Sequence, residues 1–297
     1  MKVKKNRILA LSLTLLVLFS SLMLTGFTKA KGASYLGTMS IKDKNVNNYE
    51  HIPVNISGSN LADKALLIND TTYVTLRSFS DALTDATIKY NAWQRQASVV
   101  AEGLLLTAAD GAYVVEANGR ALFAMTPVVI MSDGKMYVPV RALAKAYGVS
   151  VLWENDSRTV NIRGAFSPLE SAETYYGKDE LYWLSRIISA ESRGEPMLGQ
   201  IAVGNVVKNR VTHRDYPNTI YGVIFDKKYG VQFSPVLDGS IYQSPTYSST
   251  LSAKIVLEGF TLSEEALFFL APKIAQSNWI VTNRTYLFTI GNHDFYK

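Results

Sequence analysis

An acid, Glu191, lies in the stretch 189–196, which reads SAESRGEP. Before it, Leu181, Leu184 and Ile188 recur at spacings of three and four residues, which is typical of the buried face of a helix. Three residues further along the same face the pattern reaches Glu191. A carboxyl group therefore stands where the pattern predicts an aliphatic side chain, in the last turn of the helix.

Three features of this position disfavour the charged form of Glu191. The side chain would be partly desolvated, it would lie near the negative end of the helix dipole, and Ile187 rather than a cation stands four residues before it. A carboxylic acid that keeps its proton near neutral pH can donate it to a leaving group. We therefore predict that Glu191 is a catalytic proton donor; the alternative is an acid that fraying of the helix end turns towards solvent.

The helix that carries this acid is predicted to begin at Glu180, with Asp179 as its N-cap, and to end at Gly194. Pro196 is expected to be the first residue of a second helix, PMLGQIAVGNVVKNRV. Glu195, in the turn, is interpreted as a capping or ion-paired residue. Because Gly residues of the second helix permit close packing, two antiparallel helices are expected to hold the acid between them.

The stretch 227–245 contains several Gly and Pro residues and many aromatic and small polar ones. Aromatic rings stack on sugar faces and amides bind hydroxyl groups, so this composition suits one wall of a carbohydrate cleft, as it would also suit an ordinary surface loop. His293 either lines that cleft or is a structural residue, and Asp238 before Gly is also typical of a turn. The predicted substrate-binding residues are Gln232, Ser234, Asp238, Tyr242, Trp279 and His293.

An internal repeat precedes this region: residues 71–103 match residues 135–164. Each copy is predicted to form a short strand, a helix of about ten residues, and two strands with alternating apolar positions separated by a polar turn. The segment between the copies adds strands joined at Gly111 and Gly119. The predicted fold class is α+β, with an N-terminal two-repeat α+β domain over 63–164.

The N-terminus has the features of a secretory signal peptide: a basic start, an apolar run from Ile8 to Phe27, and small residues at a cleavage site near Ala30. The alternative is an uncleaved membrane anchor, because the run is long enough to cross a bilayer. Polar and Gly- or Pro-containing stretches are interpreted as linkers. The predicted organisation is a signal peptide at 1–30, a linker at 31–62, the repeat domain at 63–164, a linker at 165–177 and a catalytic domain at 178–297.

Composition excludes several classes of function. Five of the basic residues behind the net charge of +5 lie in the leader, so the remaining chain is nearly neutral and no nucleic-acid partner is expected. There is no Cys, and the three His residues, His51, His213 and His293, are scattered. We therefore predict no metal and no cofactor. A monomer is expected, and any regulatory partner is left open.

The repeat domain resembles the copper amine oxidase N-terminal-like domain, a stalk module of exported bacterial proteins. The stretch Val138–Arg141 and the region around Trp153 carry the resemblance. The segment 63–164 has no His and no copper ligand set, so the resemblance implies a spacer or wall contact and not an oxidase.

From Leu184 to Tyr296 the chain resembles the SleB-type cell wall hydrolases, which are spore-cortex-lytic enzymes with a lysozyme-like domain. The pieces that carry it include SAESRGEPMLGQIAVGNVVKNRV, YPNTIYGVIF, QFSPVLDGSIY and IGNHDFY. The resemblance implies a mainly helical lysozyme-like domain with a small sheet, and peptidoglycan glycan strands as the substrate. It places the catalytic acid, the first Glu of ExRGEP, at Glu191, although AES stands here where many members have GEA.

One convincing acid favours a lytic transglycosylase, in which the C6 hydroxyl of the muramyl sugar attacks the anomeric carbon and a single residue acts first as acid and then as base. Two alternatives remain open: a true muramidase-type hydrolase in which Asp238 assists, and a non-catalytic wall-binding protein. We expect a secreted protein of the cell wall or spore cortex, or one anchored in the membrane by an uncleaved leader.

Overall fold

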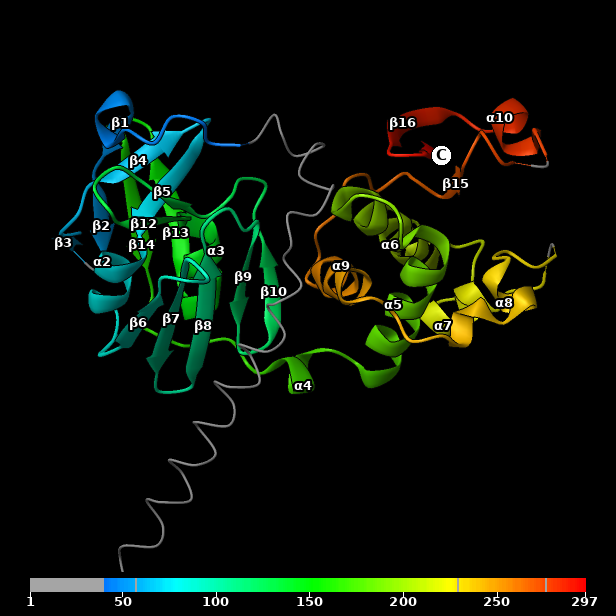
Figure 1. Ribbon diagram of the computed structural model, residues 1–297, viewed down its shortest axis with the longest axis horizontal. Coiled ribbons are helices and arrows are strands. Elements are labelled where there is room, and N and C mark those ends of the chain that lie inside the picture. The colour runs from blue at the N-terminus through cyan, green and yellow to red at the C-terminus, as the bar shows by residue number, and fades with distance from the viewer. Residues whose placement is uncertain (1–39, 57, 229, 276) are drawn as a thin grey trace, which may run out of the picture.

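The structure is a computed structural model that describes residues 40–56, 58–228, 230–275 and 277–297. Figure 1 shows a strand-rich N-terminal domain beside a helical C-terminal domain. The predicted α+β class is confirmed, with the strands concentrated in the first part of the chain and the helices in the second. The predicted signal peptide lies outside the described residues. Within these residues, no helix is both long and apolar enough to span a membrane.

The two copies of the repeat form the same elements in the same order, as the sequence predicts. The first copy contains β5 (Thr71–Thr75), α2 (Leu76–Asp81), β6 (Thr87–Asn91) and β7 (Gln96–Ala101). The second contains β12 (Met136–Pro139), α3 (Val140–Tyr147), β13 (Ser150–Glu154) and β14 (Thr159–Arg163). Both helices are shorter than the ten residues expected.

The copies are joined through their first strands, since β5 and β12 pair antiparallel with Val74 opposite Val138. The correspondence extends to the hairpin turns. Arg95 and Arg158, which occupy equivalent positions, both have left-handed backbone conformations, with φ of 49° and 48°. That conformation is uncommon for a residue other than Gly, so its occurrence in both copies indicates the same turn geometry.

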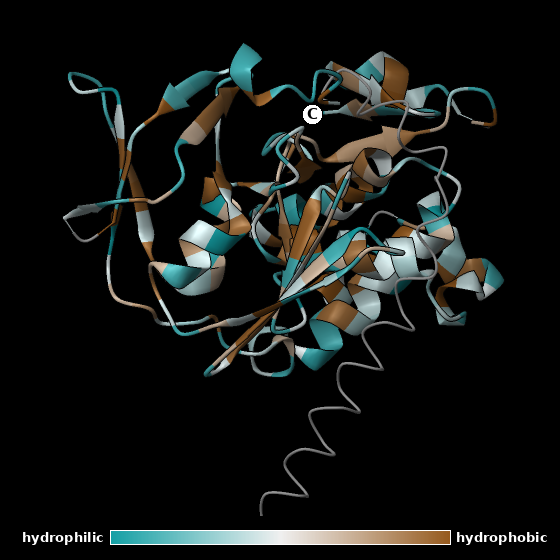
Figure 2. Ribbon diagram, turned by 60° about the vertical axis from the view of Figure 1, so that its left-hand side comes forward, coloured by the Kyte–Doolittle hydropathy of each residue, from teal (hydrophilic) through white to brown (hydrophobic). Residues whose placement is uncertain are grey.

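The segment between the copies forms the strands expected around the two Gly turns. They are β8 (Leu104–Ala109), β9 (Val114–Ala117), β10 (Arg120–Phe123) and β11 (Val129–Ile130). A five-stranded sheet has the order β10-β9-β8-β7-β6, and β11 lies at the edge of a second five-stranded sheet. Buried and half-buried side chains alternate along β8, and hydrophobic residues are frequent in both the strands and the helices of the structure (Figure 2).

The prediction of a linker over 31–62 is wrong for its later part. Residues 46–60 form a short 3-10 helix and three strands, and all three strands belong to sheets of the repeat domain. The missed signal is the alternation of Ile52, Val54 and Ile56, whose side chains are buried. The elements are η4 (Val46–Asn48), β1 (Glu50–Ile52), β2 (Val54–Ile56) and β3 (Ser59–Asn60), and β1 pairs with β4 (Ala65–Ile68).

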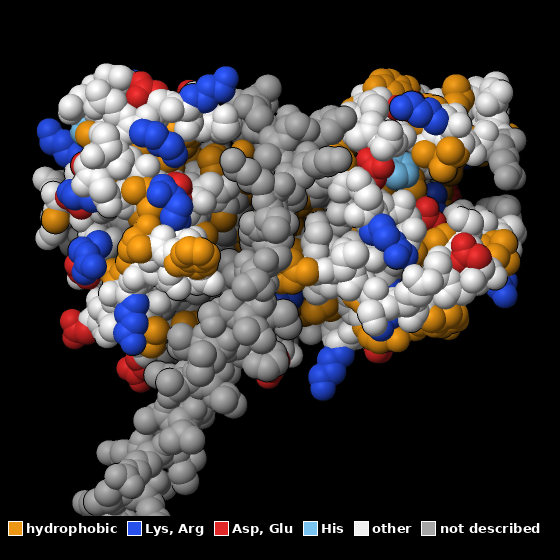
Figure 3. Space-filling view, in the orientation of Figure 1, with side chains coloured by type: hydrophobic (Ala, Val, Ile, Leu, Met, Phe, Trp, Pro, Cys, Tyr) orange, Lys and Arg blue, Asp and Glu red, His pale blue; other side chains and the backbone are white. Residues whose placement is uncertain are grey.

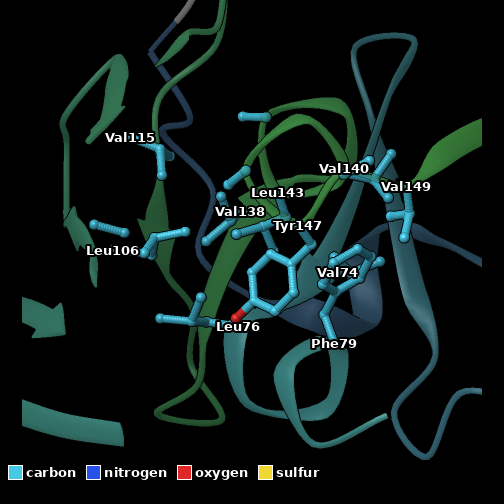
Figure 4. Packing of buried hydrophobic residues seen from close by; sticks show 14 of the residues in the cluster. Val74, Leu76, Phe79, Leu106, Val115, Val138, Val140, Leu143, Tyr147 and Val149 are labelled. Carbon is cyan, nitrogen blue, oxygen red and sulfur yellow. The ribbon is translucent and has the colours of Figure 1, made fainter. Parts of the chain in front are cut away.

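The core of the N-terminal domain lies between these sheets and the two repeat helices (Figure 4). Phe79 and Tyr147, one from each repeat helix, meet edge to face with ring centroids 5.3 Å apart. The buried hydroxyl of Tyr147 lies 2.5 Å from the hydroxyl of Ser80, so its polar end has a partner inside the core.

The C-terminal domain is built from helices and one small sheet with the order β15-β17-β16. The longest helices are α5 (Lys178–Ser192), α6 (Met197–Thr212) and α9 (Tyr247–Leu257). The shorter ones are α4 (Ala172–Tyr175), α7 (Ile220–Ile224), α8 (Pro235–Asp238), η5 (Ser240–Tyr242) and α10 (Trp279–Asn283). The strands are β15 (Phe268–Leu270), β16 (Tyr286–Ile290) and β17 (His293–Tyr296).

The predicted helix limits are shifted by one or two residues. Gly177 rather than Asp179 is the N-cap of α5, and Arg193 rather than Gly194 is its C-cap. Pro196 is the N-cap of α6 and not its first helical residue. The acids at the start of α5 fall in its first turn, where the positive end of the helix dipole favours them.

Gly204 allows α5, α6 and α9 to pack closely. A Cβ at this position would lie 2.8 Å from Cδ1 of Ile188 and 2.9 Å from Cγ2 of Val256, and both of these side chains are buried. We expect Gly204→Val to lower the free energy of unfolding by about 1–3 kcal/mol through overpacking. Urea unfolding would measure this, with Gly194→Val as the control, since a Cβ at Gly194 meets no atom within 4 Å. Equal effects of both substitutions would contradict this packing.

The two domains meet through β10 and α9. Arg120 donates two hydrogen bonds of 2.8 Å to the carboxylate of Glu258, and the side chains are only 5% and 4% exposed. The same carboxylate accepts from the hydroxyl of Tyr176 at 2.7 Å and lies 2.9 Å from Nζ of Lys145. A buried charge with this many partners ties the domains together.

Candidate active site

Glu191 lies in the last turn of α5, one residue before the helix ends. Of the predicted helical face, Leu184 and Ile188 are buried and Leu181 is half-buried. Glu191 itself is half-buried, and no hydrogen bond or ion pair holds its carboxyl group among the residues that the structure describes. A group in this position keeps a route to a substrate while most of its surface is shielded from water.

The pKa of Glu191 is raised to about 7: burial is the largest cause, the negative charge of Asp238 acts in the same direction, and the positive charge of Arg210 opposes the shift. The largest cause is therefore the one that the apolar helical face predicts. At neutral pH, Glu191 is therefore protonated in a large fraction of the molecules and can donate that proton.

Arg210, near the end of α6, was not predicted as a site residue. Its side chain is buried, its Nε donates to the carbonyl of Leu267 at 2.8 Å, and its Nη1 is buried without a hydrogen-bond partner in the described structure. The guanidinium carbon lies 5.3 Å from the ring centroid of Phe233 and 5.4 Å from that of Phe268. The positive charge of Arg210 thus lies near the rings of Phe233 and Phe268, and it acts on the pKa of Glu191.

Three of the predicted binding residues lie on the segment that ends with α8. Gln232 is half-buried and its amide donates to the carbonyl of Gly230 at 3.0 Å, and Ser234 is exposed at the N-cap of α8. Asp238 is exposed, and hydrogen bonds from the side chain of Ser240 and from its backbone N–H, at 2.8 Å, lower the pKa of Asp238. Of the three, Asp238 acts electrostatically on the acid.

Tyr242 and Trp279 are both largely exposed, at 61% and 52%. Trp279 opens α10 and lies 6.4 Å, centroid to centroid, from Phe268, which also contacts Arg210. The ring of Phe268 therefore lies between Trp279 and the buried Arg210. Tyr242 belongs to η5, which directly follows α8 in the chain.

His293 and Glu195 form a partly buried pair behind this surface. The carboxylate of Glu195 accepts from the backbone and side-chain nitrogens of Asn292 at 2.9 and 3.0 Å, and lies 3.9 Å from Nδ1 of His293. His293 is buried against Phe269, with centroids 5.5 Å apart, and burial lowers its pKa. These contacts attach the α5–α6 turn to the last hairpin, so both residues have structural partners here.

The surface of the domain is hollowed between the part that carries α10 and the small sheet and the part that carries α7 and α8 (Figure 3). Phe268 and Phe233, which belong to these two parts, both flank Arg210. The site thus combines a half-buried acid, a buried cation with one unpaired N–H group, and aromatic walls. In the described residues no group of three His, Cys, Asp or Glu side chains is placed to hold a metal ion.

Asp238→Asn is expected to shift the pH dependence of any reaction that needs protonated Glu191. Activity should fall as pH rises through the pKa of Glu191, about 7. Removing the charge of Asp238 lowers that pKa, so the alkaline limb moves to lower pH, while the maximal rate changes by less than about tenfold. A pH–rate profile measures this, with the exposed Asp215→Asn as the control. Loss of the reaction at every pH would show that Asp238 is itself required.

The chain matches two family models. Residues 194–296 match the Cell Wall Hydrolase family, and residues 54–162 match the Copper amine oxidase N-terminal domain. The order of the two domains is the one that the two resemblances predict. The first match begins after Glu191, so it carries no information on that residue.

Several curated relatives are similar to the C-terminal part. A spore cortex-lytic enzyme of Bacillus cereus is 38% identical over 122 residues, which are 41% of this chain and 46% of the relative. The spore cortex-lytic enzyme of Bacillus subtilis is 32% identical over 142 residues, 48% of this chain and 42% of the relative. The chain thus spans less than half the length of these relatives.

Two solved structures are similar to the same part. One is the catalytic domain of the germination-specific lytic transglycosylase SleB from Bacillus anthracis, 38% identical, covering 41% of this chain and 97% of the other, with a TM-score of 0.38. The other is the catalytic domain of the Bacillus cereus SleB protein, 36% identical, covering 41% and 92%, with a TM-score of 0.37.

Proposed function

Since the chain carries a cell wall hydrolase domain of the SleB type behind a copper amine oxidase N-terminal-like domain, we propose that it cleaves the glycan strands of peptidoglycan as a lytic transglycosylase. The observation that carries the proposal is the half-buried Glu191, whose pKa burial raises to about 7. Such a group is a general acid at neutral pH. The similarity to spore cortex-lytic enzymes supports peptidoglycan as the substrate class.

In the proposed reaction, Glu191 donates its proton to the glycosidic oxygen as the bond to the anomeric carbon breaks. The C6 hydroxyl of the same muramyl sugar attacks the anomeric carbon, and the Glu191 carboxylate accepts the hydroxyl proton. The products are a 1,6-anhydromuramyl end and a free hydroxyl on the departing sugar, with the acid restored. No water is consumed, and one carboxyl group is sufficient.

The surroundings of Glu191 support a single-acid mechanism. Asp238, whose charge acts on Glu191, is exposed and bonded to its own turn, and Glu195 is held by Asn292. A hydrolase of this kind usually needs a second carboxylate to activate water or to act as the nucleophile. The cation of Arg210 would stabilise the carboxylate form of Glu191 that exists between the two proton transfers.

Mass spectrometry of the fragments released from purified peptidoglycan tests the reaction class. We expect 1,6-anhydromuramyl ends from the mature protein. Reducing ends would instead indicate hydrolysis, with Asp238 as the assisting carboxylate, and the absence of any release would indicate a wall-binding protein. The same digestion of spore cortex and of vegetative sacculi would show which wall is the substrate.

The remaining organisation is proposed on the same basis. We propose that residues 1–30 are removed on export and that the enzyme acts as a secreted monomer in the cell wall or spore cortex. The repeat domain would act as a spacer or wall contact that holds the catalytic domain at its substrate. The residues Gln232, Ser234, Tyr242 and Trp279 remain proposed substrate contacts, because their side chains are exposed or half-buried.

A further inference from the structure

Five aromatic side chains cluster on the C-terminal domain away from the acid. Trp183 of α5 lies at their centre, with centroids 4.9 Å from Tyr182, 5.4 Å from Tyr221, 5.1 Å from Phe225 and 6.3 Å from Tyr242. We call these five residues the aromatic cluster. It draws on α5, α7 with the residue after it, and η5, so three separate segments of the chain contribute to it.

The cluster is fixed on its inner side and open on its outer side. Trp183 and Phe225 are half-buried and pack against the hydrophobic core of the domain. Tyr182, Tyr221 and Tyr242 are 44%, 53% and 61% exposed. Hydrophobic side chains accordingly gather on the surface over α7 (Figure 3). Folding alone does not require three exposed rings to gather at one place, and such patches commonly mark binding surfaces.

The rings are also held in place before any ligand binds. The guanidinium carbon of Arg186 lies 3.6 Å from the ring centroid of Tyr182, and its Nη1 donates to the carbonyl of the same residue at 3.4 Å. Tyr221 and Phe225 lie one turn apart on α7, with centroids 4.5 Å apart. A rigid surface of this kind loses little conformational entropy on binding.

The aromatic cluster is connected to the candidate active site through α5 and through the segment Asp238–Tyr242. Trp183 and Glu191 are eight residues apart on α5, which corresponds to about 12 Å along the helix axis. The segment Asp238–Tyr242 also connects the acid to the cluster. Its first residue, Asp238, acts on the pKa of Glu191, and its last residue, Tyr242, contacts Trp183. A polymer that is bound at the acid would reach the cluster within a few sugar units.

We propose that the aromatic cluster is a stacking platform for sugar rings of the glycan strand, beyond the bond that is cleaved. This inference rests on the proposed function, because it takes the same polymer as ligand. Its three outer rings all carry a hydroxyl group, and the guanidinium group of Arg186 lies over the ring of Tyr182, so Tyr221 and Tyr242 offer the most exposed ring faces. Uncharged ring faces with polar tips fit the alternating apolar faces and hydroxyl edges of a pyranose chain better than they fit an acyl chain or a charged peptide.

The test measures binding separately from cleavage. The Glu191→Gln protein is mixed with glycan strands freed of their stem peptides, and its affinity is measured with Tyr221→Ala and with Tyr242→Ala in the same background. We expect each substitution to weaken binding by about three- to tenfold, and Tyr221→Trp to retain binding. The matched control is Tyr90→Ala in the N-terminal domain, since Tyr90 is 53% exposed, as Tyr221 is.

Wild-type affinity in both variants would overturn the inference, as would a loss equal to that of Tyr90→Ala. A loss seen only with strands that still carry their peptides would also overturn it, because the cluster would then bind peptide. These outcomes do not depend on cleavage. If Glu191→Gln still cleaves peptidoglycan, the catalytic proposal fails, whereas weakened binding by the tyrosine variants would still support the platform.

Discussion

Replacing Glu191 by Gln is expected to stop the release of glycan fragments from peptidoglycan, with a loss in rate of about 10²–10⁴-fold. Gln has the same shape as a protonated Glu and fills the same half-buried position, but it has no acidic proton to donate. In the proposed mechanism the same side chain later accepts a proton, so both steps fail together. Release of soluble muropeptides, followed by mass spectrometry, measures the effect.

The stability of this variant provides its control. Because burial raises the pKa of Glu191 to about 7 from an ordinary value of 4.5, the folded protein binds a proton more tightly than the unfolded chain does. The contribution of Glu191 to stability therefore decreases as pH rises from 4.5 through about 7. Glu191→Gln should be at least as stable as the wild type at about pH 8. An inactive variant that is also unfolded would not support the assignment.

Glu258→Ala is expected to lower the free energy of unfolding by about 3–5 kcal/mol, because it leaves Arg120 buried without its partner. The same change removes the partner of the Tyr176 hydroxyl and of Lys145, so the interface between the domains loses several contacts at once. Urea unfolding of the mature chain measures the effect. Replacing both Arg120 and Glu258 by Met should recover part of the loss, because no charge then stays buried.

The exposed pair between Arg158 and Glu50 is the matched control. Its side chains are 58% and 48% exposed, so Glu50→Ala should change stability by less than about 1 kcal/mol. The partners of Glu258 lower its pKa, so its contribution to stability is present above the ordinary glutamate value and is lost as pH falls through the lowered pKa. Equal losses from Glu258→Ala and Glu50→Ala would contradict the role of the buried pair.

Most of the N-terminal fold follows from the internal repeat. Two copies of one pattern predict one structural unit twice, and the equivalent strands pair with each other, Val74 opposite Val138. The sequence does not predict that the earlier strands would join these sheets. Ile52, Val54 and Ile56 give only three apolar positions interrupted by Pro53, and such a short alternation is too weak to distinguish a strand from a polar linker.

Only those residues of the candidate site that interrupt a local sequence pattern could be predicted from the sequence. Glu191 interrupts an apolar helical face, and the structure half-buries it at the end of that face. Arg210 belongs to a helix that is buried on most of its surface, so the periodicity that makes an acid conspicuous on α5 gives no such contrast on α6. Its importance depends on Phe233 and Phe268, which reach it from distant parts of the chain. Of the aromatic cluster, only Tyr242 was among the predicted binding residues, because the cluster forms from three separate segments of the chain.

The measurement that tests the account most directly is an NMR titration of the side-chain carboxyl carbon of Glu191 in the folded protein. We predict a midpoint at about pH 7, with a shift to lower pH in Asp238→Asn. A midpoint near 4.5, the ordinary glutamate value, would show that the side chain is ionised at neutral pH. It would then have no proton to donate, and the proposed role of Glu191 as the general acid would be wrong.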